Sequence, residues 1–175
     1  MPADTSVKYL HSEMAGAPSL SGTAGSLISV LDACLVNGFG LKSVDALVIA
    51  ANEATMTIST GHPFEVGSVA LVEGVTTPAA INGQHRVTAI TGTTVKFETT
   101  GIADQTATGT ITTKLAPAGW SKAFSGTNLA AYKQIDLASS GMYMRIDDTA
   151  AQVARVVGYE TMSGVSTGTN PFPTT

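Results

Sequence analysis

The stretches ATMTI (54–58), SVALV (68–72), RVTAI (86–90) and VKFE (95–98) decide the fold expected for this chain. Apolar and polar residues alternate within each stretch, which is typical of a strand with one buried face. Leu47–Ile49 and Thr110–Thr112 follow the same pattern, and turn-forming residues separate the stretches. Asn82-Gly83 is the strongest hairpin signal among them, because both central residues of a type I′ turn need a positive φ. Residues 43–115 therefore predict a small β-barrel or β-sandwich module.

A different pattern precedes this module. Leu27, Leu31 and Leu35 belong to an apolar stripe with a spacing of three and four residues, which predicts a helix over residues 24–36. Thr23 is the expected N-cap, and Asn37-Gly38 supplies the expected stop. The apolar stripe of this helix is predicted to lie in a core or in an interface.

Strand-like segments return after the module, beyond the break at Ala116–Gly119. They predict three or four antiparallel strands that use the helix as a lid, and a further short strand is expected at Val7–Leu10. The segments are Trp120–Phe124, Leu129–Ile135, Met142–Ile146 and Val153–Met162.

The expected fold is thus mainly β, with the small β-barrel or sandwich module embedded in a second β-rich unit that carries one helix. The second unit is an anchoring α+β unit made of residues 1–42 plus 116–175. Residues 163–175 are rich in Gly, Thr, Ser and Pro and include Phe172. They predict a tail that is either flexible or docked on a partner chain.

The composition bears on the partners of the chain. Only 13% of the 175 residues are charged, about half the usual share. Charged residues are depleted at the centre of protein interfaces, so the composition favours a homo-oligomer; the alternative is a protein that relies on Thr, Ser and Asn for its polar surface. The residues expected in the core or at an interface are Leu27, Leu31, Leu35, Trp120 and Phe172.

Other partner classes are not expected. The net charge is −4 and the nine basic residues are scattered, whereas nucleic-acid binding needs clustered Lys and Arg. No apolar run approaches the roughly 20 residues of a membrane span. The N-terminus has no basic and apolar segments typical of a signal peptide, so synthesis in a cytoplasm is expected.

No motif predicts catalysis, a cofactor or a metal site. His11, His62 and His85 lie at no spacing that places two of them on one face, and His62 is expected to shape a turn. Asp147-Asp148 is interpreted as a turn whose carboxylates accept local amides rather than as a Ca²⁺ site. Cys34, the only cysteine, is expected to be a buried thiol.

Several segments spread over nearly the whole chain carry a resemblance to a protein class. These are Tyr9–Pro18, Leu31–Gly40, Ile58–Gly83, Thr99–Thr110, Tyr143–Asp148 and Ala154–Glu160. The chain resembles uncharacterised virion structural proteins of tailed bacteriophages and prophages, in which a small β-module is common. The resemblance supplies no catalytic residues.

This resemblance implies a non-enzymatic virion component of the tail, baseplate or connector region that is assembled in the host bacterial cytoplasm. Its partners would be other virion proteins and copies of itself. A capsid decoration (cement) protein and a module that binds host-surface glycans are the alternatives. A hydrolase would need His62 or His85 close to a Ser or Asp.

Overall fold

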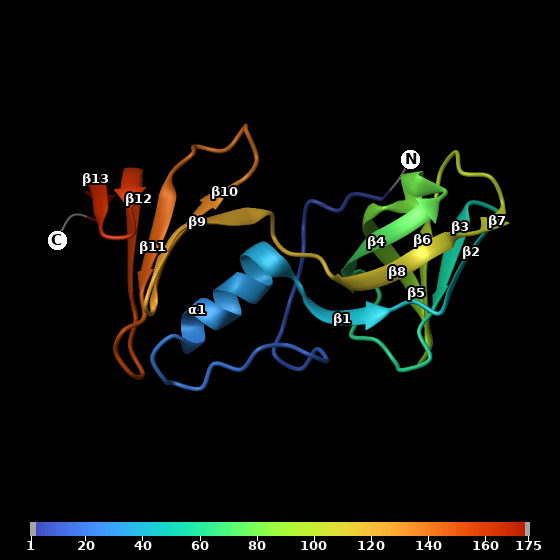
Figure 1. Ribbon diagram of the computed structural model, residues 1–175, viewed down its shortest axis with the longest axis horizontal. Coiled ribbons are helices and arrows are strands. Elements are labelled where there is room, and N and C mark those ends of the chain that lie inside the picture. Colours follow the sequence, from blue (N-terminus) through green and yellow to red (C-terminus); the bar gives the residue numbers. More distant parts are fainter. Residues whose placement is uncertain (1–2, 174–175) are drawn as a thin grey trace. The chain divides into compact units, whose positions relative to one another are not determined.

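The computed structural model describes residues 3–173 and is mainly β, with two sheets and one helix. The chain forms two compact units, and each is described here by itself. Unit 1 contains the described residues up to Ala17 together with Gly38–Ala116, and unit 2 contains Pro18–Asn37 and the chain from Pro117 onward. The expected fold class, a small curled β-module and a second β-rich unit with one helix, is confirmed (Figure 1).

The boundaries of the units differ from the predicted ones at the N-terminal side. The arm up to Ala17 and the segment Gly38–Lys42 belong to unit 1, although they were predicted in the anchoring unit. The reason is pairing: Phe39 and Lys42 lie opposite Leu115 and Thr113 in the ladder between the first and last long strands of unit 1. Such a ladder joins residues that are distant in the sequence, and alternation within one segment does not reveal it.

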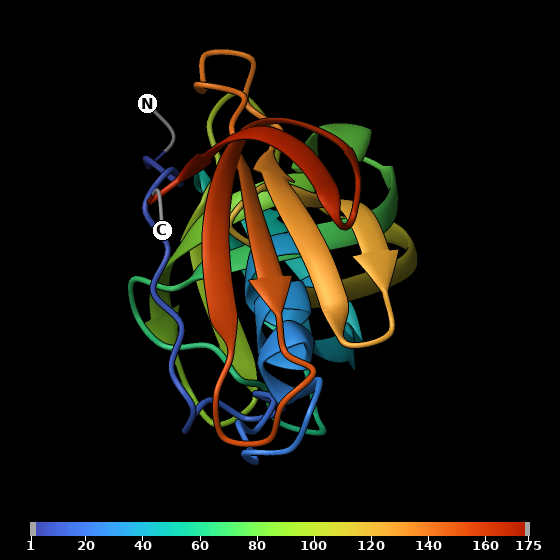
Figure 2. The same ribbon diagram turned by 90° about the vertical axis from the view of Figure 1, so that its left-hand side faces the viewer.

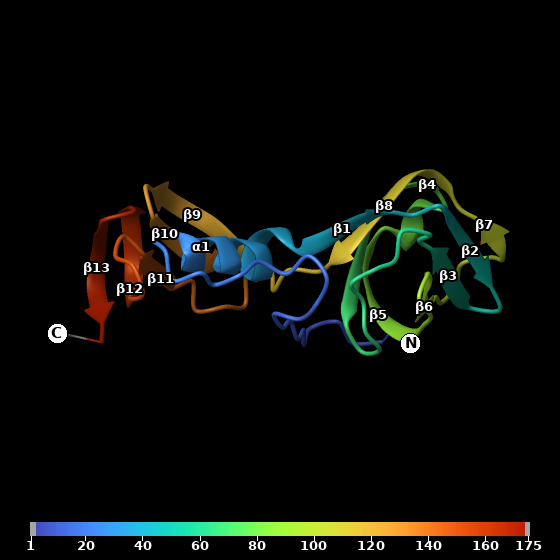
Figure 3. The same ribbon diagram turned by 90° about the horizontal axis from the view of Figure 1, so that it is seen from below.

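All neighbouring strands of unit 1 are antiparallel, in the order β1-β8-β4-β5-β6-β3-β2-β7. Only Val44 and Asp45 separate β1 from β2, and only Ala107 separates β7 from β8. Because β1 pairs with β8 and β2 pairs with β7, the sheet curls back on itself as a small barrel (Figure 3). The strands are β1 (Phe39–Ser43), β2 (Ala46–Ala50), β3 (Glu53–Thr57), β4 (Val69–Thr77), β5 (Gly83–Ile90), β6 (Thr94–Glu98), β7 (Gln105–Thr106) and β8 (Thr108–Leu115).

The alternating residues fill the inside of this barrel, as the sequence pattern predicts. Strand register places the inward side chains of β2, β3 and β6 in rows, and each of these side chains is at most 1% exposed. Polar neighbours such as Thr55 and Lys96 alternate with them and are less buried. The rows are Leu47–Met56–Val95 and Ile49–Ala54–Phe97.

The predicted hairpin turn at Asn82-Gly83 is wrong. β4 and β5 are joined by a 3₁₀ turn at Ala79–Ile81, and Asn82 has a φ of −65°. The side chain of Asn82 instead bonds the main chain of Val75, accepting from its N–H at 2.9 Å and donating to its carbonyl at 2.7 Å. The two-residue turn with positive φ lies between β2 and β3, at Ala51 and Asn52.

Unit 2 is an antiparallel sheet of five strands in the order β13-β12-β11-β10-β9, with the helix across one face (Figure 2). The expected lid arrangement is present. Ile28, Ala130, Tyr132 and Ile146 form the buried centre of this face. The elements are α1 (Ser26–Leu31), a continuing π-helical segment (Asp32–Asn37), β9 (Trp120–Gly126), β10 (Leu129–Gln134), β11 (Tyr143–Asp147), β12 (Arg155–Gly164) and β13 (Thr167–Phe172).

The predicted flexible or partner-docked tail over residues 163–175 is wrong as far as Phe172. Thr167–Phe172 is strand β13, which pairs with β12 of the same chain. The reason is that β12 runs on to Gly164 and offers a full ladder to the returning chain. Residues 174–175 lie outside the described part.

Two local predictions near the N-terminus also differ. Val7–Leu10 is not a strand, and Thr23 does not cap the helix. Gly25 is the N-cap, with a φ of 85° and no side chain to accept a bond. An aspartate from another part of the chain takes over the capping bonds, as discussed below.

Candidate functional site

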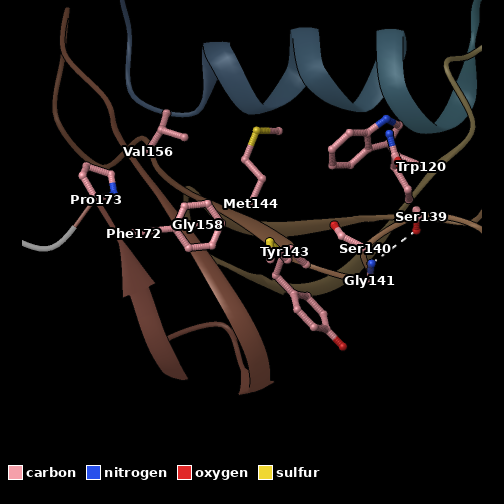
Figure 4. A pocket seen from close by; sticks show the side chains of 12 residues that line it. Trp120, Ser139, Ser140, Gly141, Tyr143, Met144, Val156, Gly158, Phe172 and Pro173 are labelled. Carbon is pink, nitrogen blue, oxygen red and sulfur yellow. Dashed lines mark hydrogen bonds between the residues drawn. The ribbon is translucent and has the colours of Figure 1, made fainter.

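An apolar recess of about 440 Å³ lies beside the helix in unit 2 (Figure 4). It is open to solvent, and its lining comes from all five strands of the sheet and from the loop between β10 and β11. The lining residues are Trp120, Gln134, Ser139, Ser140, Gly141, Met142, Tyr143, Met144, Val156, Gly158, Phe172 and Pro173.

Strand register brings the floor of the recess together. Met144 of β11 lies opposite Gly158 of β12, which lies opposite Phe172 of β13. Gly158 has no side chain, and the Phe172 ring occupies the space that a Cβ at this position would need. The ring of Phe172 therefore covers the glycine and forms one wall of the recess (Figure 4).

Several apolar side chains of the recess remain in contact with water. Val156 is 50% exposed, Phe172 is 44% exposed and Met142 is 42% exposed. Trp120 and Met144 pack against the helix core, whereas Val156 and Phe172 are not part of that cluster. The recess thus extends the apolar face of the sheet beyond the area that the helix covers.

The chemistry of the lining is that of contact rather than of proton transfer. Its polar side-chain groups are hydroxyls, one amide and the indole N–H of Trp120, and it contains no carboxylate, imidazole, ammonium or thiol group. The Tyr143 side chain points away from the helix (Figure 4), with the Lys133 ammonium 5.0 Å from its ring centre. Such a lining can exclude water from an apolar group and hydrogen-bond a few polar atoms beside it.

The five residues predicted for the core or an interface lie in the helix core or in the recess, and Trp120 belongs to both. Leu27, Leu31 and Leu35 pack with the helix against the buried centre of unit 2. Trp120 and Phe172, which are far apart in the sequence, both line the recess. Met144, Val156 and Gly158 were not singled out, because only strand register places them beside Trp120 and Phe172.

The three histidines lie apart and have separate partners, all in unit 1. His11 pairs with Glu65 at 3.0 Å, and the ring of His62, which lies between two turns and not in one, bonds the carbonyl of Thr91 at 2.7 Å. His85 bonds the carbonyl of Ile81 at 2.8 Å and stacks on Phe97. Burial lowers the pKa of His85.

The remaining reactive or acidic candidates also have local explanations. Cys34 is half-buried, and burial raises the pKa of its thiol. Asp147 accepts bonds from Thr149, which is the local turn predicted for it. Asp148 departs from that prediction, because its carboxylate bonds the helix instead.

The described residues, 3–173, offer neither a metal-binding cluster nor a membrane-spanning helix. No group of three or more His, Cys, Asp or Glu side chains in this range is arranged to hold a metal ion. Within the same range, no helix has the length and apolar character needed to cross a membrane.

Comparison of the chain with protein-family models, with curated proteins and with solved structures found no match.

Proposed function

We propose that this chain is a non-enzymatic structural subunit of a tailed-phage particle, in the tail, baseplate or connector region. It acts through contacts with copies of itself and with other virion proteins. The observation that carries the proposal is the recess of unit 2, an apolar surface with no ionisable group other than Tyr143. The phage assignment rests on the resemblance of the sequence segments described above.

The energetics of the recess favour a protein contact. Covering apolar surface gains about 25 cal/mol for each Å² removed from water. Val156, Phe172 and Met142 offer such surface without a charged neighbour in the lining that would have to be desolvated. Depletion of charge around exposed aromatic and methionine side chains is typical of interface centres.

The test compares one substitution at two places. Val156→Glu puts a carboxylate into the recess, while Val48→Glu puts the same group on the barrel, where Val48 is 43% exposed. The mass of the purified protein is measured by light scattering, and antibody labelling locates it on intact particles. We expect an oligomer that Val156→Glu dissociates and Val48→Glu preserves, with label on the tail.

The outcomes distinguish the proposed role from capsid decoration and from a contact surface outside the recess. A monomer at every concentration that never labels particles would overturn the proposal. Label spread over the capsid would replace the tail location with a capsid decoration role. Equal dissociation by both variants would show that the recess is not the contact surface.

A second candidate function, binding of a host-surface glycan, is favoured by one feature of the same recess. Trp120 and Phe172 provide aromatic side chains, and Gln134, Ser139 and Ser140 provide hydroxyl and amide groups near them. Sugars are commonly bound by such a combination of apolar surface and a few polar groups. Glycan binding is tested by titrating host-derived oligosaccharides into the protein and following the fluorescence of Trp120. Val156→Glu, which puts a carboxylate into the recess, is the control.

A further inference from the structure

The N-terminal arm of unit 1 is bound to the barrel mainly through one arginine. Arg86 of β5 donates from Nε and Nη2 to the carbonyl of Asp4, at 3.0 and 2.6 Å. The same Nη2 donates to the carbonyl of Val7 at 2.9 Å, and Nη1 donates to the carbonyl of Gly67 at 2.6 Å. Each of these acceptors is a main-chain oxygen.

None of these bonds goes to a carboxylate, the partner with which a guanidinium group forms a bidentate ion pair. Among residues 3–173, Arg86 takes part in none of the five ion pairs. Because its hydrogen-bond partners on the arm are the carbonyls of Asp4 and Val7, these bonds depend on the path of the arm, while the Asp4 carboxylate adds an electrostatic attraction. Arg86 therefore forms a binding site for an extended polypeptide backbone.

A second contact between the arm and the barrel lies at Glu65 and Val66, which directly precede Gly67 in the sequence. The Tyr9 hydroxyl donates to the carbonyl of Val66 at 2.9 Å, and Nε2 of His11 lies 3.0 Å from Oε1 of Glu65. The rings of Tyr9 and His11 are parallel within 3°. We call the set Arg86, Glu65, Val66 and Gly67 the arm cradle.

The outer arm, residues 3–11, is held without an apolar core. Val7 is 70% exposed and Tyr9 is 39% exposed, although Val7–Leu10 alternates like a strand. Within the described part of the chain, no main-chain ladder joins Val7–Leu10 to the barrel. Segments attached by exposed hydrogen bonds alone open far more readily than buried strands.

The inner arm is held differently. Met14 is only 4% exposed, and the space for a Cβ on Gly16 is limited by Gly40 at 3.0 Å. The outer arm can therefore leave the cradle while the inner arm stays in place, with Ser12 and Glu13 as the link.

We propose that the outer arm exchanges between copies of this chain, so that the cradle of one copy binds residues 3–11 of a second copy. Exchange keeps every bond described above, because arm and cradle are present in each copy. This interaction surface lies in unit 1 and is separate from the recess in unit 2.

The test uses the full chain with Cys34→Ser and two single-cysteine forms, His11→Cys with a tag and Glu65→Cys without one. The two forms are co-expressed and treated with a short bis-maleimide, which bridges the distance between these side-chain positions. We expect covalent pairs of one tagged and one untagged chain. Thr100→Cys, an exposed barrel position with no hydrogen bond to the arm, replaces Glu65→Cys as the control and should give at least tenfold less product.

Arg86 supplies the second part of the test. Arg86→Ala should lower the yield of mixed pairs severalfold. Arg86→Lys keeps the positive charge but has fewer hydrogen-bond donors, so its yield should lie between those of Arg86→Ala and the unaltered residue. Deletion of residues 3–11, which carry no core residue, gives a further check if Arg86→Ala fails to fold. Two results together would overturn the proposal. Mixed pairs would be no more abundant than with Thr100→Cys, and efficient linkage would occur only inside a single chain that carries both cysteines. Val156→Glu tests the recess separately, so the two proposals can fail independently.

Discussion

The carboxylate of Asp148 accepts a hydrogen bond from the main-chain N–H of Leu27 at 2.9 Å and a longer one from Ile28 at 3.3 Å, although Leu27 lies 121 positions earlier. These are the amides of the first turn that an N-cap side chain normally serves. Gly25 occupies the N-cap and has no side chain, and its own N–H donates to the carbonyl of Asp148 at 2.9 Å. The end of β11 thus caps the helix of unit 2.

Removal of this cap should weaken unit 2. We expect Asp148→Ala to lower the free energy of unfolding by about 1–2 kcal/mol, because one part-buried and one buried amide lose their acceptor. Asp148→Asn keeps an acceptor oxygen and should cost less. Fluorescence of Trp120, the only tryptophan, during urea denaturation reports on this unit. Asp147→Ala, at the neighbouring, partly exposed position that contacts Arg145 and Thr149 and not the helix, is the control, and an equal loss there would contradict the capping role.

The Tyr132 hydroxyl should make the stability of unit 2 depend on alkaline pH. It is fully buried and donates to Oδ1 of Asp32 at 2.8 Å, and burial together with the Asp32 carboxylate raises the pKa of Tyr132. A tyrosine in the unfolded chain ionises near pH 10. The stabilising contribution is therefore complete below about pH 10 and is lost as the pH rises towards the raised pKa.

Tyr132→Phe tests this expectation. The variant should be about 1 kcal/mol less stable at pH 7, where the bond to Asp32 is lost. It should also show a smaller decline in stability between pH 7 and about pH 11 than the unaltered protein does. Tyr159→Phe removes a half-buried hydroxyl from the same sheet and is the matched control. Parallel pH profiles for Tyr132→Phe and the unaltered protein would refute the prediction.

His85 should make the barrel sensitive to acid. Its ring lies 4.2 Å from the centre of Phe97 and bonds the carbonyl of Ile81, and burial lowers its pKa in spite of that bond. The unfolded chain then binds the proton more readily, so the contribution is present above about pH 6.5 and is lost as the pH falls. We expect His85→Asn to flatten the profile of barrel stability between pH 7 and about pH 5. The slope is measured by hydrogen exchange or by denaturation of the barrel, and an unchanged slope in His85→Asn would contradict the prediction.

Gly158 and Phe172 should show strong energetic coupling. A Cβ on Gly158 meets the Phe172 ring, so Gly158→Ala should displace the ring and destabilise the β12–β13 hairpin by roughly 1–3 kcal/mol. Phe172→Ala alone exposes the glycine and should cost about 1 kcal/mol. If the clash is the cause, Gly158→Ala should be almost without effect in a Phe172→Ala background. Additive losses in this double-mutant cycle would show that the two positions act independently.

The sequence predicted the parts of the fold that depend on local periodicity. Alternation at Ala54–Ile58 and Val95–Glu98 reflects a strand with one face inside the barrel, and the spacing of Leu27, Leu31 and Leu35 reflects a helix with one face on a sheet. Trp120 and Phe172 were predicted for the core or an interface, and the structure places both in the lining of the recess. Each of these inferences uses neighbours within a few positions along the chain.

The tertiary structure decided which distant residues share a site. A local turn was predicted at Asp148, but its carboxylate accepts a hydrogen bond from the main chain of Leu27 in the helix. A two-residue turn was predicted at Asn82, but its side chain accepts a hydrogen bond from the main chain of Val75. The recess exists because register aligns Met144, Gly158 and Phe172 on three strands. Periodicity determines which face of a segment is buried, whereas the partner of that face depends on hydrogen-bond ladders and packing between segments far apart in the chain.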